Sequence, residues 1–416
     1  MRIAIEYGKK PIEFDVPTSR LRGIIEPKAV KPLADVPAAV KRALRKPVGS
    51  PPLTDVLHGS KTAVIVTVNH TRPSPRPMLL PILDECERQG VQPTICIAGG
   101  RHALMTNADV RRHLGADIVR RCPVVQHDPF DRDACRHLGT TQRGTEILVN
   151  KIIFEHDCVI GTGILEPSYL AGFSGGRKLL MPALAFHTSI DNNHFYLTAP
   201  GTRIGRLVGN PLSEDATEFA RACPYHFICY TVSGPNDEPV QVIAGDPYQA
   251  HEAACDRTAR IYRVRAKTAP IIVSSAGGHP YDCNLVQGKK GIIPAIELVE
   301  RNGAIILLAA CPGGLGAEPT FIDWMRTKTP VEVVRDVGKR ELFNLGAHGA
   351  NILAKPIVER NATVIMVTRP AIAKALEGTY VRAVTRFEDA WALANMLCGR
   401  KAPVVVARKA RRLIVE

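Results

Sequence analysis

Aromatic residues are scarce in this sequence of 416 residues, in which Phe, Trp and Tyr together make up 5%. No basic run is interleaved with residues that stack on bases, and no nucleic-acid-binding motif occurs, although the formal net charge is +14. A protein that binds nucleic acid is therefore not favoured. The excess of Lys and Arg instead predicts a basic surface and a pocket that attracts anions.

Long hydrophobic runs are also missing, since no stretch approaches the ~18 consecutive apolar residues of a membrane-spanning helix. The first residues, MRIAIEYGKKPIEFDV, alternate like a β-strand and lack the apolar core and cleavage site of a signal peptide. We expect a soluble cytoplasmic protein, a monomer or small homo-oligomer, with neither a membrane nor a nucleic acid as partner.

Paired cysteines and local metal motifs are absent as well. Eleven cysteines are scattered from Cys86 to Cys398 without a CxxC pair, so neither a disulfide framework nor a zinc site is favoured. HExxH does not occur, and spacing alone does not argue for a metal held only by protein ligands. GxGxxG follows none of the predicted strands, so the familiar dinucleotide-binding fold is not supported.

Short apolar, β-rich runs separated by helical stretches are present throughout, which is typical of parallel sheets. Their near-continuous hydrophobicity suits strands that are covered on both faces. We therefore predict an α/β fold, with two α/β domains, mostly parallel sheets and an interdomain cleft. The clearest predicted strands are 62–68, 93–98, 157–162, 270–275, 304–309, 362–368 and 403–407.

One helix start is legible near the predicted domain boundary, where Asp246 can act as N-cap and Pro247 as the first helical residue. This helix should run to about Arg263, and the polar stretch RVRAKTA that begins there separates the domains. We predict an N-terminal cofactor-binding α/β domain over 1–266 and a C-terminal α/β domain over 267–416. The last strand could pack on either domain.

Ligands of open α/β sheets bind outside the carboxyl ends of the strands. The residues that follow each predicted strand therefore form a candidate site, and polar and cationic residues gather there, as an anion site requires. These segments are 69–73 (NHTRP), 99–102 (GGRH), 163–178 (GILEPSYLAGFSGGRK) and 276–282 (AGGHPYD).

The small residues of AGFSGGRK let a backbone approach a ligand closely, and successive amides can cradle a phosphate. Walker A spacing is absent because Leu179 follows Lys178. Taken alone, the glycines equally fit an ordinary strand-to-helix turn, and Lys178 equally fits a solvated surface lysine.

Single residues leave similar alternatives open. His102 and His194 each fit a structural histidine as well as a functional one. Arg72 could clamp a carboxylate through two parallel hydrogen bonds and Lys290 could add a point charge, or both could be surface cations.

Taken together, these segments resemble the nickel-dependent lactate racemase family over most of the chain. The ordered set is NHTRP, GGRH, EPSYLAGFSGGRK, NNH, GNP and PYDCNLVQGKKG. Each piece alone is a weak signal, but six in this order are specific, and Lys178 and His194 have the family's spacing.

The resemblance implies a racemase or epimerase that moves a hydride reversibly between a 2-hydroxy acid and a nickel-pincer nucleotide. Lys178 would carry this cofactor covalently, His194 would bind its nickel, and His102 would be an acid/base. Separate enzymes make the cofactor, so protein produced without them could lack it. The remaining implied contacts are Thr71, Ser174, Gly175 and Gly176 for the cofactor, and Arg72, Gln287, Lys290, Ser168 and Tyr169 for the substrate.

These residue types suit the chemistry that the resemblance implies. Histidine, with an ordinary pKa near ~6.5, can exchange the hydroxyl proton at neutral pH. No amino-acid side chain accepts a hydride, so a cofactor must do so.

The sequence departs from the family where a second catalytic histidine would stand, because Ser168 occupies that position. Another residue could supply the second base, and we favour His348 over the neighbouring Tyr169. The space at Ser168 also suits a substrate larger or more polar than lactate. Asn69 stands where relatives often carry Asp. Two alternatives stay open: a non-catalytic relative that binds the cofactor or an anion, and an oxidoreductase that releases the 2-oxo acid.

Overall fold

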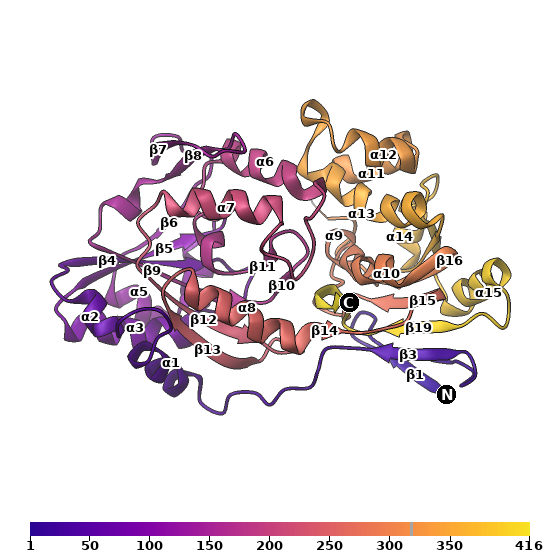
Figure 1. Cartoon of the computed structure of the whole chain (residues 1–416), viewed down its shortest axis with the longest axis horizontal. Helices are drawn as coiled ribbons and strands as arrows, with labels where there is room; N and C mark the ends of the chain where they lie inside the picture. Colours follow the sequence, from indigo (N-terminus) through magenta and orange to yellow (C-terminus); the bar gives the residue numbers. More distant parts are fainter. Residues whose placement is uncertain (317–318) are drawn as a thin grey trace. The chain divides into compact units, whose positions relative to one another are not determined.

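A computed structural model describes residues 1–316 and 319–416, and the chain forms two compact units. The central unit is Ala29–Ile261, and the terminal unit joins Met1–Lys28 to Tyr262–Glu416. Each unit is built around its own mostly parallel sheet (Figure 1).

The predicted first domain, 1–266, is wrong at its N-terminal end. β3 (Leu21–Ile25) pairs in parallel with β19 (Val404–Ala407), which places the first residues in the terminal unit. In Figure 1 the indigo β3 accordingly lies beside the yellow β19. Because the paired strands lie at opposite ends of the chain, no local pattern around residue 28 predicts this pairing.

A six-stranded sheet in the order β13-β12-β9-β4-β5-β6 forms the core of the central unit. Its neighbours run parallel except β12 and β13. The strands are β4 (Thr62–Val68), β5 (Gln92–Ala98), β6 (Val124–Gln126), β9 (Cys158–Leu165), β12 (Phe227–Ser233) and β13 (Pro239–Gly245), and two hairpins are formed by β7 (Cys135–Thr140) with β8 (Glu146–Asn150) and β10 (Pro167–Ser168) with β11 (Gly172–Phe173).

Helices α1, α2 and α3 cover one face of this sheet, where Leu44, Leu57 and Leu79 join Ile65 and Ile95 in a single apolar cluster. The helices of the central unit are α1 (Val36–Arg45), α2 (Leu53–Leu57), α3 (Arg76–Arg88), α4 (Asn107–Leu114), α5 (Ala116–Arg121), α6 (His187–Phe195), α7 (Pro211–Arg221) and α8 (Gln249–Tyr262), which ends at the start of the terminal unit.

The terminal unit contains a parallel sheet in the order β18-β17-β16-β15-β19-β3. Its other strands are β1 (Arg2–Ile5), β2 (Ile12–Asp15), β14 (Arg263–Val264), β15 (Ala269–Ser275), β16 (Val299–Leu308), β17 (Thr363–Val367), β18 (Arg382–Val384) and β20 (Ile414–Val415). Its helices are α9 (Leu285–Gly288), α10 (Ile292–Leu298), α11 (Pro319–Thr327), α12 (Pro330–Asp336), α13 (Leu345–Arg360), α14 (Pro370–Ala375) and α15 (Phe387–Cys398).

All of the predicted strands are present; 62–68 matches β4 at both ends, and the others have shifted ends. β9 continues through Leu165, so residues 163–165 belong to the strand rather than to the loop after it. The predicted helix near the boundary is α8, which begins at Gln249 rather than at Pro247. Asp246 Oδ1 accepts hydrogen bonds from the backbone N–H groups of Tyr248 and Gln249 at 2.9 and 2.8 Å. Within the described residues, no helix has the length and apolarity that crossing a membrane requires.

Candidate functional site

The carboxyl ends of β4, β5 and β9 lie at one edge of the central sheet, because these strands are parallel neighbours. A cavity of about 240 Å³ opens there and brings together three segments that the sequence singled out. The residues that line it are Val68, Asn69, Thr71, Arg72, Ala98, Gly99, Gly100, His102, Ile164, Leu170, Ser174, Gly175, Lys178, Leu179, Pro182, Ala183, His194 and Tyr230.

Asn69 shapes the loop that follows β4. Its buried Oδ1 accepts hydrogen bonds from the backbone N–H and the hydroxyl of Thr71, at 3.2 and 2.5 Å. Gly99 leaves the room that Asn69 needs, since a Cβ at Gly99 would lie 2.8 Å from Asn69 Nδ2. The exposed Arg72 follows directly, and its guanidinium contacts the Thr71 carbonyl at 2.9 Å. The loop thus presents a hydroxyl and a cation at the cavity.

The glycine-rich turn after β11 is held by Ser174. Its hydroxyl donates to the Ile164 carbonyl at 2.8 Å and accepts the backbone N–H of Glu166 at 2.9 Å. Gly175 and Gly176 follow with φ of 77° and 55°, a region that favours glycine. The Ser174 side chain is therefore engaged with the protein backbone, and the backbone of Gly175 borders the cavity.

Lys178 projects from the 3₁₀ turn Gly176–Leu179 and lines the cavity. Burial lowers the pKa of Lys178 to about 8, and the nearby guanidinium of Arg72 adds to this effect, whereas the carboxylate of Glu166 opposes it. A substantial fraction of this amine is therefore neutral just above neutral pH. Neutral lysine is the nucleophilic form.

His194 enters the cavity from α6. Burial lowers the pKa of His194 to about 4, and the cations Lys178 and Arg101 act in the same direction. Its Nδ1 is buried and has no hydrogen-bond partner of good geometry among the described residues. An imidazole that stays neutral, with a nitrogen not engaged in this way, is suited to bind a metal ion.

A buried network holds α6 in place. The fully buried carboxylate of Asp215 accepts hydrogen bonds from Asn193 Nδ2 at 2.7 Å and from the hydroxyls of Thr141 and Thr145 at 2.6 and 2.8 Å. Asn193 directly precedes His194. The network therefore ties the helix that carries His194 to α7 and to the β7–β8 hairpin.

His102 lies in the loop after β5, exposed to solvent at the cavity wall. Its backbone N–H donates to the Gly99 carbonyl at 3.2 Å. The preceding Arg101 pairs with Asp191 of α6, so this loop and the helix that bears His194 are joined by an ion pair.

Three predicted site residues of the central unit lie outside the lining of this cavity: Ser168, Tyr169 and Gly176. Ser168 pairs with Gly172 in the β10–β11 hairpin, and its Oγ accepts the N–H of Ala171 at 3.5 Å. Leu170, from the same hairpin, lines the cavity instead.

The other predicted site residues, Gln287, Lys290 and His348, belong to the terminal unit. Asn284 caps α9 by accepting the N–H of Gln287 at 3.0 Å. One turn later, Lys290 Nζ donates to Gln287 Oε1 at 2.6 Å, so this predicted pair is adjacent. His348 lies on α13 and is 8% exposed. Their catalytic and binding roles stay predictions.

Sequence reasoning missed Tyr230, whose ring lines the cavity from β12. The run FICYTVS that forms β12 is as apolar and β-rich as the strands that were found, so a signal was available. Burial raises the pKa of Tyr230, which keeps the phenol protonated.

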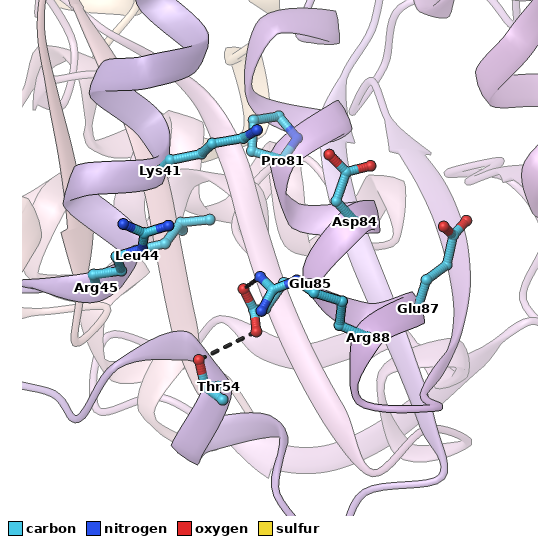
Figure 2. A pocket seen from close by; sticks show the side chains of 9 residues that line it. All are labelled: Lys41, Leu44, Arg45, Thr54, Pro81, Asp84, Glu85, Glu87 and Arg88. Atoms are coloured by element: carbon cyan, nitrogen blue, oxygen red, sulfur yellow. Dashed lines mark hydrogen bonds and ion pairs between the residues drawn. The ribbon is translucent and has the colours of Figure 1, made fainter.

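A second hollow, of about 550 Å³, lies between α1, α2 and α3 (Figure 2). Its carboxylates have partners, since Glu85 pairs with Arg88 and accepts the Thr54 hydroxyl at 3.1 Å, and Asp84 and Glu87 both pair with Arg121. None of the predicted site residues lines it. We therefore place the functional site at the smaller cavity.

The described residues contain no group of three or more His, Cys, Asp or Glu side chains arranged to hold a metal ion. All eleven cysteines are free thiols. His194 can supply one imidazole nitrogen.

Known proteins resemble this chain along most of its length. The family model for the lactate racemase N-terminal domain matches residues 7–205, and that for the lactate racemase C-terminal domain matches residues 264–415. A lactate racemase from Thermoanaerobacterium thermosaccharolyticum is 34% identical over 376 residues, or 88% of each chain. A lactate racemase from Lactiplantibacillus plantarum is 32% identical over 280 residues, or 66% of each chain.

Solved structures also resemble this chain. The structure of the lactate racemase apoprotein from Thermoanaerobacterium thermosaccharolyticum matches all of both chains with a TM-score of 0.93 and 31% identity. A crystal structure of a protein from Thermotoga maritima matches 93% of this chain and 99% of that one, with a TM-score of 0.68 and 18% identity, which shows a shared fold. The predicted α/β fold with mostly parallel sheets is confirmed.

Proposed function

Because the chain belongs to the lactate racemase family, we propose that it racemises or epimerises a 2-hydroxy acid with a nickel-pincer nucleotide attached to Lys178. The observation that carries this proposal is the Lys178 amine, whose pKa is lowered to about 8 in a cavity that His194, His102 and Arg72 also line. An amine in this state is prepared for covalent attachment near neutral pH.

Three features of the central unit fit such a cofactor. The positive-φ backbone at Gly175 borders the cavity without a side chain, which lets a nucleotide approach closely. The imidazole of His194 lines the cavity, and burial lowers its pKa to about 4, so it stays neutral and can bind nickel. Arg72 offers a cation for anionic groups, and Thr71, whose hydroxyl donates to Asn69, borders the cavity beside it.

When bound, the nucleotide supplies the hydride acceptor that no side chain provides. The protein residues have separate tasks. Arg72 holds the substrate carboxylate through paired N–H donors, and a ring nitrogen of His102 takes up or returns the hydroxyl proton. Gln287 and Lys290, which are hydrogen-bonded to each other, hold the remaining substrate oxygens.

A second acid/base group must replace the histidine that Ser168 displaces. A serine hydroxyl is a poor base. Tyr169 is no better, because burial raises its pKa and keeps the phenol protonated. We assign the role to His348 on α13, and we propose a substrate larger or more polar than lactate, because serine has a smaller side chain than the histidine it replaces.

The test begins with co-expression of the chain and the enzymes that make the cofactor, followed by intact mass and nickel analysis. We expect one nucleotide adduct and about one nickel per chain. Lys178→Arg should abolish the adduct, whereas Lys151→Arg, a change at an exposed lysine of the same unit, should leave it intact. Absence of both adduct and nickel, with a lactate racemase loading normally in parallel, would refute the proposal.

Activity is measured next on the loaded enzyme with lactate and larger 2-hydroxy acids deuterated at C2. Interconversion of stereoisomers with the label retained is the expected result, and His102→Ala should abolish it. A 2-oxo acid that accumulates beyond the amount of enzyme would indicate an oxidoreductase instead. Loading without any conversion would indicate a binding protein.

We also propose that the protein acts in the cytoplasm and receives its cofactor from separate enzymes there. The eleven free thiols support a reducing compartment.

A further inference from the structure

A histidine behind the glycine-rich turn has no part in the proposed chemistry. His251, on α8, is 1% exposed, and its Nε2 donates to the Ser174 carbonyl at 2.9 Å. Because a carbonyl only accepts, this nitrogen carries the proton. Burial lowers the pKa of His251 to about 3, and the cations Arg177 and Lys178 add to the effect, so the ring stays a neutral donor.

The same ring packs against Gly176, two residues after Ser174. A Cβ at Gly176 would lie 2.6 Å from Cγ and Cδ2 of His251, so the imidazole occupies the space of a side chain. Gly176 also has a φ of 55°. The ring therefore contacts the turn twice, through a hydrogen bond at Ser174 and through close packing at Gly176.

Two tyrosines complete the support of the turn. The hydroxyl of Tyr225 donates to the Gly176 carbonyl at 3.3 Å and lies 3.3 Å from the hydroxyl of Tyr230. The ring of Tyr230 faces Gly175, where a Cβ would lie 3.3 Å from it. Two consecutive glycines, which have the greatest backbone freedom, are thus enclosed by rigid rings.

The position of this glycine-rich turn determines where Lys178 lies. The Lys178 backbone N–H donates to the Gly175 carbonyl at 3.1 Å, and the Lys178 carbonyl accepts the N–H of Ala183 at 3.2 Å. We propose that His251 is a positioning residue that holds the Ser174–Gly176 turn so that the Lys178 amine stays in the cavity beside Arg72. This inference rests on the proposed role of Lys178 as the attachment site.

The test uses the full-length apoprotein and needs neither cofactor nor activity. Pyridoxal 5′-phosphate, a phosphate-bearing aldehyde, forms an imine with neutral lysine, and borohydride reduction makes the label permanent for peptide mass spectrometry. The measured quantity is the labelling rate of Lys178 as a function of pH, relative to the exposed Lys151 in the same sample.

His251→Leu, which removes the donor, should slow Lys178 labelling at least tenfold near pH 7 and move its pH midpoint upward from about 8. Complete release to the ordinary pKa of 10.5 would slow it about 300-fold, the ratio of neutral amine at the two values. His251→Gln keeps a neutral N–H donor and should restore most of the rate. Tyr225→Phe, a milder change, should slow labelling by a smaller factor.

The matched control is Thr258→Val on the same helix. Thr258 is fully buried and donates to the Ala254 carbonyl at 2.8 Å, so its loss weakens α8 without removing the bond to Ser174. Unchanged labelling in His251→Leu and Tyr225→Phe would overturn the proposal, as would an equal decrease in Thr258→Val. If His251→Leu does not fold, His251→Gln and Tyr225→Phe decide the question.

The outcomes separate this inference from the proposed function. Slowed labelling in His251→Leu, together with no nucleotide adduct in the co-expressed wild type, would uphold the positioning role and refute the cofactor assignment. A normal adduct with unchanged labelling in the variants would uphold the cofactor assignment and refute the positioning role.

Discussion

Replacing Lys178 by methionine should stabilise the apoprotein at neutral pH. Burial lowers the pKa of this amine from its ordinary 10.5 to about 8, so the folded chain disfavours its charged form. At ~1.36 kcal/mol per pKa unit, keeping the proton costs the folded state about 3 kcal/mol. Methionine has a similar length and no charge, so Lys178→Met should raise the free energy of unfolding by about 2–3 kcal/mol near pH 7.

The pH dependence of this gain has a definite sign. Below about pH 8 the amine is protonated in both the folded and the unfolded chain, and the full cost is present. Between about pH 8 and 10.5 the unfolded chain binds more protons, so the stability of the wild type rises with pH. The advantage of Lys178→Met should therefore shrink across this interval.

Urea unfolding followed by circular dichroism at several pH values measures the effect. Lys151→Met serves as the control, because Lys151 is exposed in the same unit and its replacement should change stability by less than about 0.5 kcal/mol. A Lys178→Met protein that is no more stable than the wild type near pH 7 would refute the reasoning. So would a gain that does not vary with pH.

Three further changes test the packing around the site and in the terminal unit. Asp215→Ala should lower the free energy of unfolding by about 3 kcal/mol or more in urea titrations, because three buried donors lose their acceptor, and a smaller loss would contradict the network. Gly172→Ala should lower the urea midpoint far more than Gly139→Ala, since a Cβ at Gly172 would lie 2.0 Å from the Arg206 carbonyl oxygen and one at Gly139 would meet nothing within 4 Å. Asp336→Asn should lower the melting temperature at neutral pH. Neighbouring cations lower the pKa of Asp336 below its ordinary 3.8. The stability that this carboxylate contributes is therefore complete above pH 3.8 and is lost as the pH falls toward the pKa of the folded state. A difference in melting temperature that stays constant down to acid pH would contradict this reasoning.

Local sequence was sufficient for the parts of the fold that depend on nearby residues. β4 and β9 are recognisable because their side chains are buried on both faces of a sheet, which requires near-continuous apolar sequence. The capping of α8 by Asp246 is equally local, since donors and acceptor are neighbours in the chain. The segments 69–73 and 99–102 could be named for the same reason, because each directly follows a strand.

Contacts between residues far apart in the sequence could not be predicted from local patterns. The pairing of β3 with β19 joins the two ends of the chain, and no pattern within either strand specifies its partner. Tyr230 lines the cavity only because β12 lies next to β9. Ser174 was predicted to contact a cofactor, yet its hydroxyl is engaged with the backbone of Ile164 and Glu166.

The sequence by itself determined the α/β class, the family and the identity of the candidate residues, because these depend on short motifs and their order. Only the tertiary structure decided the state of those residues. Lys178 is an ordinary lysine in the sequence, and its lowered pKa arises from burial and from Arg72, which lies more than one hundred positions away. Its position depends in turn on His251, which no motif includes. Charge interactions and burial act through space, so they exist only once the chain has folded.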